Sequence, residues 1–258
     1  MKRTKLQLLT LFTLSCFLMG CSQETKITEE DASLEAEPTT VIDLATAGSI
    51  AGKVSFKGSP PRMRRIAMGA VPECEGLHKG KVVVSEQVIL SEDGKLSNVF
   101  VYVKKGLEGM TFEIPSDPGH LNQKGCLYTP HVLGVQAGQE IQIHTSDPTT
   151  HNIHPMPEKN REWNTSMAPG ARALKRKFTR PEIMIPIKCN VHPWMRAYVG
   201  VVNHPFFAVT GADGSFEISG LPPGDYVVSA WHEKFGTSEQ SVSVGAKEVK
   251  AADFTFQG

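Results

Sequence analysis

The residues TGADGSFEISGLPPGDYVV, from Thr210 to Val228, alternate apolar and polar side chains around two turn sequences. Asp213-Gly214 and Pro223-Gly224 supply the turns, because glycine accepts a positive φ and proline restricts φ. In both directions the chain continues as short β-type runs broken by Gly, Pro, Asn and Asp. This pattern predicts an all-β protein made of sandwiches or barrels. We expect strands over residues 49–56, 81–90, 98–103, 132–136, 140–144, 183–188, 198–202, 206–210, 215–218, 225–232 and 240–244.

The 210–228 stretch resembles the carboxypeptidase regulatory-like, transthyretin-type β-sandwich, whose usual pattern is a TDxxGxFxxxxLPxGxY block. Gly211 stands where that family usually carries Asp. The two opening strands of the family resemble Gly48–Phe56 and Asn98–Val103, which lie far upstream in this chain. The resemblance therefore implies that another domain is inserted in the sandwich, because loop tips tolerate insertions whose two ends lie close together. The expected divisions are residues 48–118 for the first part of the sandwich, 119–203 for the inserted domain and 204–258 for the second part.

The N-terminus has the features of an export signal. Basic residues precede a mostly apolar run from Leu8 to Met19, which is too short to span a bilayer. The run ends in Leu18-Met19-Gly20-Cys21, which resembles the lipobox of bacterial lipoproteins. We therefore expect residues 1–20 to be a signal peptide and Cys21 to be lipidated. The protein would then be anchored to a bacterial membrane, facing the periplasm or the cell surface.

The segment after the signal is acidic and lacks aromatic residues. It cannot bury enough apolar surface to offset its ordering entropy, so we expect residues 21–47 to form a disordered tether. Without residues 1–20 the chain carries 24 basic against 27 acidic side chains. This balance argues against nucleic acid as a partner.

Two short segments at the ends of expected strands carry metal-ligating side chains. Residues 148–154, PTTHNIH, offer an imidazole, and residues 189–195, CNVHPWM, offer a thiolate, an imidazole and a thioether. Two His, one Cys and a weak axial Met form the ligand field of a blue copper centre, since soft sulfur holds Cu(I) and imidazole suits both oxidation states. An odd number of cysteines after the signal and lipid sites also leaves one thiol without an internal disulfide partner.

These segments resemble the amicyanin and plastocyanin-like cupredoxins, in which a Pro-His-Asn-Val-His segment supplies the first ligand and a Cys-x2-His-Pro-Phe-Met-Arg segment supplies the others. The resemblance implies a Greek-key cupredoxin domain over residues 119–203 that holds one type 1 copper ion. It also implies that Asn152 ties the two ligand loops together from outside the ligand set. By this resemblance the copper ligands are His151, Cys189, His192 and Met195.

The remaining histidines and cysteines have other expected roles. His154 lies three residues after His151, so in an extended chain its ring points to the opposite face and we expect it at the surface. Cys74 and Cys126 would form a disulfide in an exported protein. A second metal site that uses Cys74 and His78 is the alternative.

The predicted function is one-electron transfer, without catalysis, to another exported redox protein such as a cytochrome or a dehydrogenase. We expect His192 to be the point of electron exchange, reached through an apolar surface patch. One alternative is an extracytoplasmic copper carrier, although Met-rich and His-rich clusters are not evident. Another is a surface binding module in which copper is secondary. The basic residues between Arg172 and Arg180 form either a docking face for an acidic partner or a solvated strand.

Overall fold

The computed structural model describes residues 39–258, so the predicted signal peptide and the lipidation site at Cys21 lie outside the described residues. The end of the predicted tether lies within them. Thr40 N donates a hydrogen bond to Thr111 O, and Lys247 N donates one to Thr46 O, so residues 40–46 are held against the folded body. Within the described part of the chain, no helix has the length and apolar character needed to cross a bilayer.

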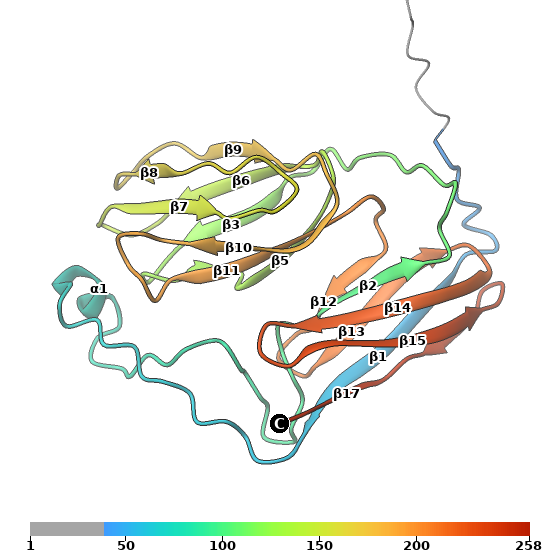
Figure 1. Ribbon diagram of the computed structural model, residues 1–258, viewed down its shortest axis with the longest axis horizontal. Coiled ribbons are helices and arrows are strands. Elements are labelled where there is room, and N and C mark those ends of the chain that lie inside the picture. Colours follow the sequence, from blue (N-terminus) through green and yellow to red (C-terminus); the bar gives the residue numbers. More distant parts are fainter. Residues whose placement is uncertain (1–38) are drawn as a thin grey trace, which may run out of the picture. The chain divides into compact units, whose positions relative to one another are not determined.

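Strands from both ends of the described chain form one β-sandwich, which we call the split sandwich (Figure 1). One sheet has the order β13-β1-β16, with β17 also paired to β1, and the other has the order β12-β2-β14-β15. In Figure 1 the blue β1 therefore lies among orange and red strands. The strands are β1 (Gly48–Lys57), β2 (Phe100–Lys105), β12 (Phe207–Val209), β13 (Ser215–Leu221), β14 (Gly224–His232), β15 (Gly236–Val244), β16 (Val249–Ala251) and β17 (Phe254–Gln257).

The intervening strands form a second sandwich, which we call the ligand sandwich. It pairs a five-stranded sheet of order β5-β11-β10-β7-β8 with a four-stranded sheet of order β4-β3-β6-β9 (Figure 1). The predicted all-β fold is thus confirmed. The strands are β3 (Gly119–Gln123), β4 (Tyr128–Thr129), β5 (Val132–Gln136), β6 (Glu140–Thr145), β7 (His151–Pro155), β8 (Thr165–Met167), β9 (Leu174–Lys177), β10 (Glu182–Lys188) and β11 (Arg196–Val202).

The two sandwiches have separate apolar cores, and a third buried cluster joins strands of both. That cluster includes Phe100 of β2 together with Val132 and Val202 of the ligand sandwich. Glycine permits the close approach: a Cβ on Gly134 would lie 2.5 Å from the ring of Phe207. Side chains larger than hydrogen would therefore push the sheets apart at this contact.

The long excursion between β1 and β2 differs from the prediction. Residues 81–90 do not form a strand, since they make only isolated bridges such as Arg65 with Val84. Val82 and Val84 are 56% and 47% exposed, whereas Val88 is buried in the core of the split sandwich without belonging to a strand. The excursion instead contains a short helix, α1 (Pro72–Leu77), which begins with proline at its first position and buries Cys74.

Buried neutral histidines make the split sandwich sensitive to acid. His204 Nε2 donates to Val103 O at 2.9 Å, while its Nδ1 accepts from Phe206 N at 3.2 Å. Burial lowers the pKa of His204 from 6.5 to about 4. As the pH falls from about 6.5 to 4, His204 therefore binds a proton in the unfolded chain but stays neutral in the folded protein.

We predict that the free energy of unfolding falls by about 3 kcal/mol over this pH range because of His204 alone. His204→Gln should flatten this part of the stability curve, measured by denaturant unfolding at several pH values. His120→Gln, at an exposed histidine, is the matched control and should leave the slope unchanged. Equal slopes for wild type and His204→Gln would contradict the prediction.

Candidate metal centre

The two predicted ligand loops meet at one end of the ligand sandwich. His151 is the first residue of β7, and Cys189 directly follows β10. The loop from Cys189 to β11 closes on itself: Met195 N donates to His192 O at 2.9 Å and Cys189 N donates to Met195 O at 3.3 Å. This tight turn brings side chains at positions 189, 192 and 195 to the same place, which a straight strand cannot do.

Three donor atoms converge at this place. The Nδ1 atoms of His151 and His192 are 2.9 Å apart, and Cys189 Sγ lies 3.8 Å from His192 Nδ1. All three ligand atoms lie within 4.8 Å of one another. An ion bonded at about 2.0 Å to nitrogen and about 2.3 Å to sulfur spans both separations. The donors therefore fit one metal ion without rearrangement of the backbone.

Chemistry and burial favour copper at this position. One thiolate and two imidazoles are the strong ligands of a blue copper site, with thioether as the weak fourth. Met195 is fully buried and belongs to the same apolar cluster as Cys189. Among the described cysteines, Cys189 alone lies outside a disulfide. The residues present thus fit a type 1 ion.

Asn152 connects the two ligand loops, as the resemblance implied. Its Oδ1 accepts from the backbone N–H groups of Asn190 at 2.6 Å and Val191 at 3.3 Å. Its own N–H donates to Cys189 Sγ at 3.5 Å, and the Cys189 thiol donates to Asn152 Oδ1 at 3.3 Å. Asn164 Oδ1 in turn accepts from Asn152 Nδ2 at 2.6 Å and orients the carboxamide. The loop that carries three ligands is therefore anchored on the strand that carries the first.

Two further residues support the site and were not predicted. Asp147 Oδ2 accepts from His151 Nε2 at 2.9 Å, and the carboxylate is held by the N–H groups of Gly125 and Cys126. A carboxylate in this position fixes the imidazole so that its Nδ1 faces the Nδ1 atom of His192. Tyr128 O–H donates to Asn152 O at 2.6 Å and Lys188 O at 3.0 Å, so it bridges β7 and β10.

The electrostatics of the cluster set the protonation state of each donor side chain. Burial opposes ionisation of Cys189, but hydrogen bonds from His151 and from backbone N–H groups outweigh it and lower the pKa of the thiol. Burial and the neighbouring His151 charge lower the pKa of His192. The site therefore favours a thiolate beside a neutral His192 imidazole. Burial opposes protonation of His151, but its hydrogen bonds with Asp147 and Cys189 outweigh burial and raise its pKa to about 9, so His151 would release a proton when a metal binds.

His192 lies beneath a disulfide, and the prediction that it reaches the surface is wrong. Cys74 and Cys126 are joined, and Cys74 Sγ lies 3.5 Å from His192 Nε2. The ring of Trp194 covers another side of the imidazole at 5.2 Å between centroids. Trp194 is itself held by a hydrogen bond from Nε1 to Cys126 O at 3.0 Å. As a result His192 has no exposed surface.

The other predicted residues add no donor atom to the cluster of His151, Cys189 and His192. His154 is partly buried and pairs with Glu162 at 2.5 Å. The disulfide consumes the thiol of Cys74, and His78 Nε2 bonds Gly125 O at 2.8 Å, so the alternative second metal site is not formed. The basic run lies on the edge strand β9, where Lys175 pairs with Glu140 at 3.1 Å. Charges on an edge strand also prevent pairing with other sheets.

Comparison with known proteins gives a family match at one end of the chain. Residues 192–257 match the carboxypeptidase regulatory-like domain. The match covers β12 to β17 and reaches back into the ligand loop, but it does not include β1 and β2, which pair with these strands in the split sandwich. No match is found among curated proteins.

Several solved structures are similar to part of the chain. A Cu-containing nitrite reductase from Thermus scotoductus SA-01 matches 40% of this chain at 17% identity, with a TM-score of 0.32. This chain spans only 25% of that reductase. A mutant of amicyanin in the Cu(I) state matches 34% of this chain and 86% of its own at 21% identity and TM-score 0.30. A purple cupredoxin from Nitrosopumilus maritimus matches 32% of this chain and 98% of its own at 17% identity and TM-score 0.28.

We predict that Asn152→Ala weakens copper binding by roughly tenfold to a hundredfold, because outer partners of ligands contribute on that scale. The change removes the acceptor that holds the backbone of Asn190 and Val191. Competition with a Cu(I) chelator measures the effect. Asn122→Ala is the control, since the Asn122 amide bonds Ser146 away from the ligands. An unchanged affinity in Asn152→Ala would show that the loop is held by other contacts.

Proposed function

We propose that this protein holds one type 1 copper ion and transfers single electrons. The observation that carries the proposal is the convergence of His151, Cys189 and His192 within 4.8 Å, with buried Met195 closing the same loop. The ion would supply the Cu(II)/Cu(I) couple. The protein contributes the ligand set, its burial and its fixed orientation.

The surroundings of the ligands favour electron transfer because they resist rearrangement. Asn152 and Tyr128 connect the two ligand strands, and Asp147 fixes the first imidazole. The disulfide closes a segment with a sequence separation of 52, and in the chain-entropy model the lost chain entropy would destabilise the unfolded state by about 4 kcal/mol. A site whose ligands move little between the two oxidation states exchanges electrons with a small reorganisation.

Burial distinguishes this role from the copper carrier. A carrier passes its ion to a partner's ligands, which must reach the metal. Here His151, His192 and Met195 have no exposed surface, and Cys189 is 2% exposed. An electron can pass through the side chains that cover the site, whereas an ion or a bulky substrate cannot. The same burial therefore argues against a catalytic role.

The proposed setting is outside the cytoplasm. The disulfide between Cys74 and Cys126 supports export, because such bonds persist in oxidising compartments. We propose that the exported protein is held to the membrane by lipid at Cys21 and exchanges electrons with another exported redox protein. Half-buried Trp194, next to His192, is the proposed point of exchange in place of His192 itself.

We predict an intense visible absorption band in the oxidised, copper-loaded protein, arising from charge transfer between the Cys189 thiolate and Cu(II). Cys189→Ala should remove the band and leave the fold intact, as judged by circular dichroism. Asn122→Ala is the control, because the Asn122 amide bonds Ser146 away from the donor side chains and the variant should keep the band. A band that survives Cys189→Ala would refute the blue copper assignment.

We predict that Met195→Gln lowers the reduction potential while copper is retained, since the axial ligand tunes the potential and the other three supply most of the binding. Voltammetry measures the first effect and chelator competition the second. The carrier hypothesis replaces electron transfer if the wild type shows no reversible one-electron wave, or if it yields Cu(I) readily to a weak chelator.

A further inference from the structure

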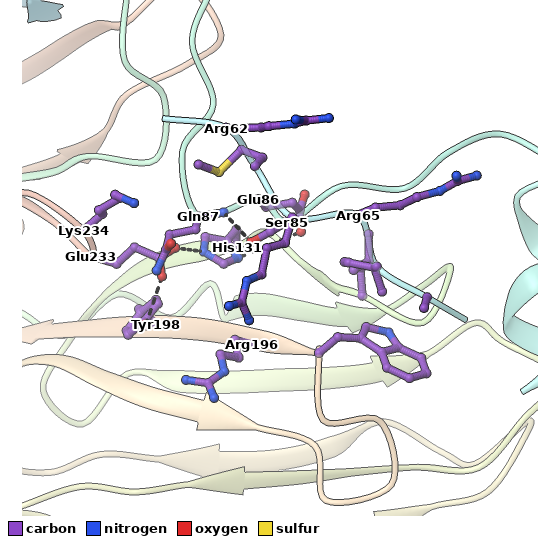
Figure 2. A pocket seen from close by; sticks show the side chains of 16 residues that line it. Arg62, Arg65, Ser85, Glu86, Gln87, His131, Arg196, Tyr198, Glu233 and Lys234 are labelled. Carbon is purple, nitrogen blue, oxygen red and sulfur yellow. Dashed lines mark hydrogen bonds and ion pairs between the residues drawn. The ribbon is translucent and has the colours of Figure 1, made fainter. Parts of the chain in front are cut away.

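A cavity of about 480 Å³ lies beside Trp194 and is lined by segments that are far apart in the sequence (Figure 2). We call it the arginine pocket. Its walls come from residues 62–67 and 85–87 of the excursion, from Trp194, Arg196 and Tyr198 of the ligand sandwich, and from Glu233 and Lys234 of the split sandwich. A volume of this size accommodates a small organic molecule.

Backbone hydrogen bonds brace the wall that carries most of the arginines. Ile66 N donates to Val83 O at 2.9 Å, and Ser85 N donates to Arg64 O at 2.8 Å. The two stretches of the excursion therefore support each other although they do not form a regular sheet. These hydrogen bonds hold the two stretches together at the wall of the pocket.

The lining has an excess of positive charge. Five basic side chains line the pocket, and none of them forms an ion pair with a carboxylate of the described residues 39–258. Glu233 is already engaged, since it accepts from His131 Nε2 at 2.5 Å and from Tyr198 O–H at 3.2 Å. Burial raises the pKa of Glu86, the other acidic lining residue. The basic side chains are Arg62, Arg64, Arg65, Arg196 and Lys234.

A buried polar atom in the lining also lacks a partner. His131 is 8% exposed, and its Nδ1 makes no hydrogen bond within the part of the chain that the structure describes. The nearest carboxylate oxygen, on Glu86, is 3.9 Å away. Figure 2 shows His131 in the middle of the lining, held on its other side by Glu233. A buried nitrogen without a hydrogen-bond partner is unfavourable. Since Nε2 donates to Glu233, Nδ1 of the neutral ring would accept a hydrogen bond from an O–H group of a ligand in the pocket.

We propose that the arginine pocket binds a small organic anion that carries carboxylate or phosphate groups. Guanidinium groups match both oxyanions with paired N–H donors, and Ile66, Leu127 and Trp194 give the pocket an apolar side for the organic part. The inference does not depend on copper. It does place the bound anion against Trp194, whose ring contacts the ligand His192.

The test is calorimetric titration of the protein without its signal peptide, copper-free and copper-loaded, with citrate in one series and pyrophosphate in another. Saturable binding of either probe is expected in both forms, and the tighter probe identifies carboxylate or phosphate as the preferred group. The double change Arg65→Gln and Arg196→Gln should weaken binding at least tenfold. The control Arg172→Gln with Lys177→Gln removes the same charge from an exposed region outside the pocket and should have no effect.

A second readout places the anion in the pocket. Binding should change the fluorescence of the wild type, and Trp194→Phe should lose that change while it retains the calorimetric signal. Equal weakening by the pocket and control variants would overturn the proposal, since the binding would then be a general charge effect. A glutamate-rich peptide that binds more tightly than both small anions would also overturn it and favour docking of an acidic protein.

Discussion

The candidate metal centre depends on the hydrogen bonds that the Asn152 carboxamide makes with the loop after β10. The carboxamide oxygen accepts from the N–H groups of Asn190 and Val191, and the Asn152 N–H donates to Cys189 Sγ, so a single residue sets the position of the loop that bears three of the proposed ligands. Tyr128 repeats the connection from the opposite side through the carbonyl groups of Asn152 and Lys188. Since a buried loop with unsatisfied backbone groups is unfavourable, these hydrogen bonds also make it possible for the loop to be buried at all.

Burial of two imidazoles and a thiol in an apolar core is unfavourable unless each polar atom has a partner. Asp147 meets this requirement for His151, and Asn152 meets it for Cys189. His192 has a weaker partner, the disulfide sulfur, with Trp194 packed beside it. The imbalance leaves His192 the least supported ligand inside the protein, and it is also the ligand next to the arginine pocket.

The convergence of Cys189 and His192 could be predicted because their spacing is local: both lie with Met195 within one short loop. The burial of His192 beneath the disulfide could not be predicted, because Cys74 and His192 are 118 positions apart in the sequence. Asp147 stands four residues before His151 and next to a proline, and neither feature distinguishes it in the sequence from other carboxylates. The sequence predicted a strand at residues 81–90 that does not form and missed the strand β9, which does form. Both errors have one reason: a segment becomes a strand only when a neighbouring strand is available to pair with it. The valines at 82–84 have no regular partner strand, whereas the charged β9 pairs with β6.

The division of the split sandwich determines the order in which the protein can be completed. Strand β1 ends at Lys57, yet it pairs with β17, and Lys53 N bonds the carboxylate of Asp253, 200 positions later. The ligand sandwich, in contrast, is one continuous stretch that emerges well before the last strand. A growing chain can therefore close its ligand sandwich while β1 still presents unpaired backbone groups. That edge is covered only once β17 has emerged, so a polypeptide that lacks β17 leaves the backbone groups of residues 54–57 unpaired on one side even when its ligand sandwich has folded.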